Sequence, residues 1–78
     1  MIVNRNSLDA RFLSDIRVLE DKYNLIIQLE YIKDDMVAHC FSTDFQLLEV
    51  ATIKVGTRED SKERKYIKLS KELKRIMA

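Results

Sequence analysis

The 78-residue sequence predicts one α+β domain, residues 1–78, in the order helix, three antiparallel strands, helix. Apolar residues recur with the 3.6-residue period of a helix near both ends of the chain, and with a two-residue period in between. A single glycine and the absence of proline leave few breaks inside these elements. A short extra strand at residues 2–4 is left open. The alternative architecture is a β-meander or small barrel with one C-terminal helix.

The first helical pattern begins near Asn6 or Ser7, either of which can cap the first turn. Asp9 suits the N-terminal dipole, and Asn24 suits a left-handed residue that ends the helix. The apolar stripe comprises Leu8, Phe12, Ile16, Leu19 and Tyr23. Residues 12–19 could instead form a strand, because some apolar side chains there fall off this stripe. The helix is the favoured interpretation.

The next segment, residues 25–32, alternates between two faces as a strand does, and residues 36–41 resume the apolar pattern after charged residues. A tight hairpin with Asp34 and Asp35 at its turn is the expected connection. The predicted pairs on one face are Ile32 with Val37, Glu30 with His39 and Gln28 with Phe41. The predicted core face carries Leu29, Tyr31, Ala38 and Cys40.

A third strand is expected between residues 45 and 55, because the end of this segment is rich in β-branched residues. Its two-residue phase is blurred at residues 47–49, which indicates a bulge there. Gly56 suits a turn that leaves the sheet. The sheet is therefore expected to end at this glycine.

The second helix is expected to begin near Asp60 or Ser61, since Asp60 and Glu63 have the spacing of a capping box. Its predicted apolar face comprises Tyr66, Leu69, Leu73, Ile76 and Met77. The opposite face carries Arg64, Lys68, Lys71 and Arg75. These four cations follow helical spacing, so the helix should present a continuous basic stripe to solvent.

Charge is divided unevenly along the chain. Residues 1–53 carry five basic and nine acidic side chains, whereas residues 54–78 carry nine basic and four acidic ones. A basic helix suits nucleic acid, because counterion release drives sequence-independent binding to phosphates. The expected contact residues are Arg64, Lys65, Lys68, Lys71, Lys74 and Arg75. Tyr66 lies on the apolar face, so contacts should reach phosphate or an acidic protein and not bases. The competing interpretation is an ordinary solvated helix surface that nearby glutamates partly neutralise.

The outer face of the predicted sheet is a second candidate surface. Its apolar members are Ile26, Ile32, Val37 and Phe41. These side chains are too apolar for a face left in water, so a second copy of the chain or a target protein should cover them. Alternatively, one of the two helices crosses over to this face.

Catalytic, metal and cofactor chemistry are not expected. His39 and Cys40 are adjacent in a strand and therefore project to opposite faces, which prevents a nucleophile and base pair. One histidine and one cysteine cannot fill a tetrahedral metal shell, and one glycine cannot make a phosphate-binding loop. The lone cysteine, the lack of a signal-peptide pattern and the lack of a membrane-length apolar run predict a reducing, cytoplasmic setting.

The predicted element order resembles that of the double-stranded RNA-binding domain, a family whose RNA contacts include basic residues near the start of the last helix. Lys62, Arg64 and Lys65 occupy a comparable place here. The alanine-rich last helix and the Gly-, Pro- and His-containing loop of that family are absent. The resemblance is therefore one of topology, and it assigns no family.

These patterns predict a small cytoplasmic or phage-encoded regulatory binding protein, a homodimer, whose last helix contacts nucleic acid or another polyanion. It is not expected to be an enzyme. The alternative is a protein-interaction module, such as an inhibitor or adaptor, that uses the apolar sheet face.

Overall fold

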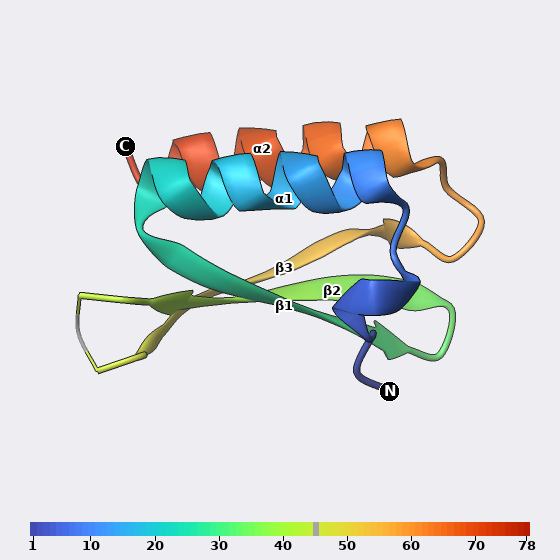
Figure 1. Cartoon of the computed structure of the whole chain (residues 1–78), viewed down its shortest axis with the longest axis horizontal. Coiled ribbons are helices and arrows are strands. Elements are labelled where there is room, and N and C mark those ends of the chain that lie inside the picture. Colours follow the sequence, from blue (N-terminus) through green and yellow to red (C-terminus); the bar gives the residue numbers. More distant parts are fainter. Residues whose placement is uncertain (45) are drawn as a thin grey trace.

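The computed structural model describes residues 1–44 and 46–78 and has two layers. Two helices lie side by side on one face of a three-stranded antiparallel sheet, and no described helix lies on the other face (Figure 1). The elements are η1 (Arg5–Ser7), α1 (Ala10–Tyr23), β1 (Leu25–Ile32), β2 (Asp35–Ser42), β3 (Glu49–Thr57) and α2 (Lys62–Ile76). The predicted α-β-β-β-α order is confirmed, and the one-helix alternative is wrong.

The start of α1 differs from the prediction, whereas its end agrees with it. Asp9, and not Asn6 or Ser7, is the N-cap, because its carboxylate accepts two amides of the first turn. Asn4 instead caps the short η1 turn that precedes it. Asn24 ends α1 in the left-handed conformation, at φ 55°. Residues 12–19 are helical, so the strand alternative for them is wrong.

The hairpin of β1 and β2 turns one residue earlier than predicted. Lys33 and Asp34 form its two-residue loop, with Lys33 at φ 56°. The observed pairs include Ile32 with Asp35, Glu30 with Val37 and Gln28 with His39. Moving the turn by one residue moves every pair by two, so the predicted partners are wrong but the predicted faces are right.

The third strand begins and ends later than predicted. It pairs with β2 as Glu49–Thr57, and Phe45, the predicted first residue, lies outside the described residues. Two register shifts interrupt the pairing, at the Met36/Val37 and Cys40/Phe41 steps of β2. Gly56 does not leave the sheet, because it lies inside β3 opposite Met36 with φ 148°.

The core lies between the sheet and the two helices. Its buried apolar residues are Phe12, Ile16, Leu19, Leu25, Ile27, Leu29, Met36, Ala38, Cys40, Ile53, Val55, Leu69 and Leu73. Tyr31, Tyr66 and Met77 pack against this cluster, whereas Ile76 is 38% exposed. The predicted core face of the hairpin is thus confirmed, with Tyr31 at its margin.

The free edge of β1 is closed by the N-terminal segment. Ile2 bridges Glu30, which confirms that the segment at residues 2–4 includes a strand-like contact. The Val3 N–H donates to the Leu29 carbonyl at 2.9 Å, and the Tyr31 N–H donates to the Met1 carbonyl at 2.8 Å.

A carboxylate closes the rest of this edge. The Ile27 N–H donates to Glu20 Oε2 at 2.7 Å, and Arg5 holds the same carboxylate through a forked pair at 2.9 and 3.3 Å. Partners thus reach the outer edge of β1 at Ile27, Leu29 and Tyr31.

Candidate functional site

The basic stripe of α2 points to solvent because the opposite side of the helix is anchored. Leu69 and Leu73 are buried against the sheet. The Ser61 hydroxyl, and not the Asp60 carboxylate, caps the helix by accepting the Arg64 N–H at 3.2 Å. The exposed cations of the stripe are Arg64, Lys68, Lys71 and Arg75, and Lys74 is exposed beside them.

The side of α2 that carries this stripe is its basic face, and Glu72 neutralises part of it. Its carboxylate lies 2.8 Å from Arg75 and 3.7 Å from Lys68. The hydrogen bond from Arg75 is the main reason why the pKa of Glu72 lies below its ordinary value. Within the described residues, Arg64 and Lys71 make no ion pair within 4.0 Å. Exposed Lys74 makes none in this part of the chain either, so the charge available to a partner is greatest at these three residues.

Lys65 lies apart from the basic face although it is a neighbour of Arg64 in sequence. Its side chain is 5% exposed, and burial is the main cause of its lowered pKa. The ammonium lies 5.9 Å from the centre of the Tyr31 ring and 3.5 Å from the Arg58 carbonyl. The Arg58 guanidinium stacks on the same ring at 4.0 Å. Lys65 is thus a packing residue between α2 and the sheet.

A surface groove of about 430 Å³ separates the basic face from β3. Its lining residues are Lys54, Val55, Gly56, Asp60, Arg64 and Lys68. Asp60 is the one acidic residue of this lining, and its carboxylate accepts the Thr57 N–H at 2.7 Å. The groove therefore combines an edge strand with cations from α2.

None of the described helices covers the outer sheet face (Figure 1). Ile26 is 42% and Ile32 is 50% exposed, while Val37 and Phe41 are half-buried by their neighbours. Neither helix crosses to this face, so that interpretation of the sequence is wrong.

His39 lies at the centre of the outer face between two carboxylates. Its Nε2 lies 2.9 Å from Glu30 Oε1, and its Nδ1 lies 2.9 Å from Glu49 Oε1. The pKa of His39 is raised, first by the hydrogen bond to Glu49 and second by that to Glu30. The sequence predicts the contact with Glu30, but as a directly opposite pair, whereas Glu30 lies opposite Val37. Glu49 was missed because a bulge in β3 brings it into reach.

This cluster predicts a pH-dependent contribution to stability. A raised folded pKa means that the contribution is complete below the unfolded value of 6.5 and is lost as pH rises through the folded pKa. From pH 5.5 to pH 8, the parent should therefore lose more stability than a His39→Gln variant. Urea unfolding of both proteins at the two pH values measures this difference. Equal losses would show that the carboxylates do not stabilise the imidazolium.

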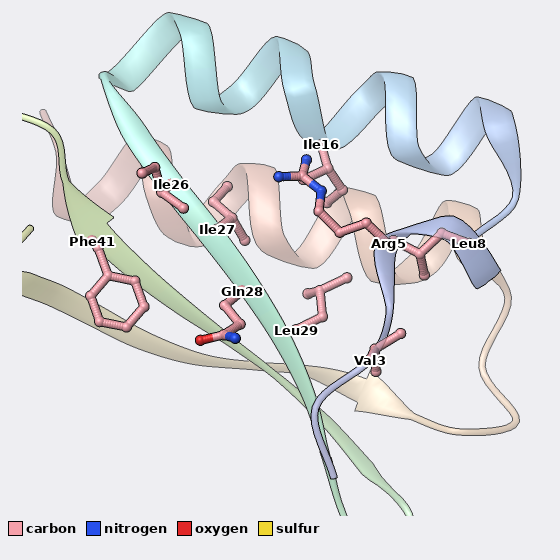
Figure 2. A pocket seen from close by; sticks show the side chains of 9 residues that line it. All are labelled: Val3, Arg5, Leu8, Ile16, Ile26, Ile27, Gln28, Leu29 and Phe41. Atoms are coloured by element: carbon pink, nitrogen blue, oxygen red, sulfur yellow. The ribbon is translucent and has the colours of Figure 1, made fainter.

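A pocket of about 260 Å³ wraps around the closed edge of β1 (Figure 2). Its lining residues are Val3, Arg5, Leu8, Ile16, Ile26, Ile27, Gln28, Leu29 and Phe41. Arg5 is its one ionised side chain, and this guanidinium is already held by Glu20. The pocket is accordingly a mainly apolar hollow beside the outer sheet face.

Cys40 lies on the core face, away from His39. It is free and fully buried, and burial raises the pKa of its thiol to about 11. In the described part of the chain, His, Cys, Asp and Glu side chains form no group of three that could hold a metal ion. None of the described helices is both long and apolar enough to cross a bilayer.

No family model matches this chain, and comparisons with curated proteins and with solved structures give no significant match. The similarity to the double-stranded RNA-binding domain remains one of element order. Of the three cations at the comparable place, Lys62 pairs with Asp9 at 3.3 Å and Lys65 is buried. Only Arg64 belongs to the basic face.

Proposed function

We propose that the protein is a small regulatory binding protein that holds a polyanion, either nucleic acid or an acidic protein surface, on the basic face of α2. The observation that carries this proposal is the exposure of four aligned cations on a helix whose other side is buried. We place this activity in the cytoplasm, since Cys40 is a free thiol. No catalytic role is proposed.

The geometry suits contact with a phosphate backbone. From Arg64 to Arg75 the helix rises about 16 Å, which is close to five base-pair steps of duplex DNA at roughly 3.4 Å each. Tyr66 is partly buried against the core and offers no ring for stacking on this face. Binding should therefore be electrostatic and tolerant of sequence.

The test measures binding of labelled duplex and single-stranded nucleic acid by fluorescence anisotropy at 50 and 200 mM salt. If four phosphates are contacted, the parent should lose roughly 10²-fold in affinity for duplex over this range. Replacement of Arg64, Lys68, Lys71 and Arg75 by glutamine should weaken binding at 50 mM salt by at least about 10-fold.

A charge-matched variant controls for net charge. Changing Arg11, Arg17, Lys22 and Lys33 to glutamine removes four exposed cations outside α2 and gives the same net charge. This variant should keep most of the affinity, because its basic face is intact. Equal weakening in both variants, or no binding of nucleic acid by the parent at 50 mM salt, would contradict nucleic acid as the polyanion.

The exposed outer sheet face favours a second candidate function, a protein-interaction module such as an inhibitor or adaptor. A homodimer through this face is its simplest form, because a second copy would cover Ile26 and Ile32 together.

Light scattering tests the dimer. The parent should have about twice the 9.2 kDa chain mass, and Ile32→Ser should lower it toward 9.2 kDa. Ile67→Ser, which changes a similarly exposed residue on α2, should leave the mass unchanged. A constant mass of 9.2 kDa for the parent would rule out the dimer.

A further inference from the structure

The two edges of the sheet differ in how many of their backbone groups have hydrogen-bond partners. The edge of β1 is closed by the N-terminal segment and by the Glu20 carboxylate. Along β3, only the last amide, that of Thr57, has such a partner, the Asp60 carboxylate. The Thr57 carbonyl also accepts the Asp60 N–H, at 3.2 Å. Within the described residues, no hydrogen bond from a loop, terminus or side chain reaches the outer backbone edge of β3 before Thr57.

The hydrogen bonds at the outer edge of β1 show which backbone groups of this strand point toward β2. The Leu29 carbonyl accepts from Val3, so the backbone of Leu29 points away from β2. Because successive residues point to opposite sides of a strand, Gln28 directs its backbone toward β2 at His39. The same alternation can be followed across β2.

Thr52 and Lys54 carry the unpaired backbone groups of β3. His39 bonds to β1, so its neighbour Ala38 points to β3, where its partner is Ile53. Thr52 and Lys54, on either side of Ile53, direct their N–H and C=O groups to the free edge. These two residues are about 6.8 Å apart along the strand, which is also the distance between alternate residues of an extended peptide.

The side chains beside this edge are mainly cationic. Arg64 and Lys68 line the groove from α2, and Lys54 lines it from the strand. Lys54 also pairs with Asp35 at 3.4 Å. A second copy of this edge would meet like charges, a device that discourages edge-to-edge pairing. A strand with carboxylates would instead gain from the same cations.

We propose that an extended acidic peptide binds in this groove as an added strand on β3, with its carboxylates toward Arg64 and Lys68. This inference rests on the proposed polyanion-binding function and names its partner. The register shifts on either side limit regular pairing to residues 51–54, so the recognised segment is short. A peptide is favoured over nucleic acid because only a peptide can satisfy alternating backbone donors and acceptors.

The probe is a synthetic peptide of four Thr-Glu repeats, with acetyl and amide ends. In an added strand, the amides of one residue type face β3 and those of the other type face solvent. Two derivatives carry N-methyl groups, one on every Thr and one on every Glu. We expect one derivative to lose at least 10-fold in affinity by calorimetry and the other to bind like the parent peptide.

Amide hydrogen exchange gives an independent readout on the unmodified protein. The amides of Thr52 and Lys54 should exchange quickly when free and at least 10-fold more slowly with the peptide bound. Ile53, whose amide points to β2, should be protected in both states. Variants of the protein are not needed, so misfolding cannot mimic the result.

The outcomes separate this inference from the proposed function. Equal affinity of both methylated peptides, or no added protection at Thr52 and Lys54, would show that the peptide does not bind as an added strand on β3. This holds even if the basic face binds duplex. Protection of these amides by duplex instead of peptide would also overturn it. Absence of binding to both peptide and duplex at 50 mM salt would overturn both proposals.

Discussion

Leu73→Ala should destabilise the protein by about 3 kcal/mol, since leucine-to-alanine changes in a core cost about 2–5 kcal/mol. Leu73 is 0% exposed and joins α2 to the sheet. A domain of this size has a free energy of unfolding near 4–12 kcal/mol, by the usual value per residue. The variant should therefore melt about 12–24 °C lower, by the usual conversion for small domains. Thermal and urea unfolding measure both quantities.

Ile67→Ala is the matched control on the same helix. Ile67 is 52% exposed, so its truncation should change the free energy of unfolding by less than about 0.5 kcal/mol. Similar losses in both variants would show that α2 does not pack through the face described here. Because the basic stripe depends on that packing, the same result would also weaken the proposed function.

Gly56→Ala should cost about 2–3 kcal/mol, through backbone strain together with a steric clash. Gly56 has φ 148°, which residues with a side chain rarely adopt. An added Cβ would lie 2.6 Å from Asp60 Oδ2, the atom that accepts the Thr57 N–H. The Asp60 carboxylate would have to shift. Urea unfolding measures the loss.

Asp60→Ala separates strain from clash in a double-mutant cycle. Alone, it should destabilise the protein by about 1 kcal/mol through loss of the hydrogen bond to Thr57. Combined with Gly56→Ala, it removes the clash but leaves the strained backbone, so the double variant should lose less than the sum of the two. Additivity within about 0.5 kcal/mol would show that the clash contributes nothing.

The element order was predictable because local patterns decide it. Phe12, Ile16 and Leu19 share one helical face in the sequence, and all are buried. The two-residue period of the hairpin assigned the right side chains to the core even though the turn was misplaced, since a shift of two residues preserves the faces. Asn24 ended α1 as expected, through a conformation that asparagine tolerates.

The boundaries were less predictable because several residues compete for each role. Asn6 and Ser7 lie within η1, which Asn4 caps, so the N-cap of α1 is Asp9. Ser61 likewise caps α2. The Asp60 carboxylate instead accepts an amide at the end of β3, a partner that helical spacing does not include.

The sequence alone specified two amphipathic helices, an alternating hairpin and a basic stripe on the last helix, because helical and strand periods express themselves over neighbouring residues. Contacts between distant residues required the folded chain. Only the tertiary structure placed Lys65 over Tyr31, put Glu49 beside His39, closed one sheet edge with Glu20 and left the β3 edge beside the basic face. Such contacts depend on how layers pack and where bulges fall, and no local period encodes them.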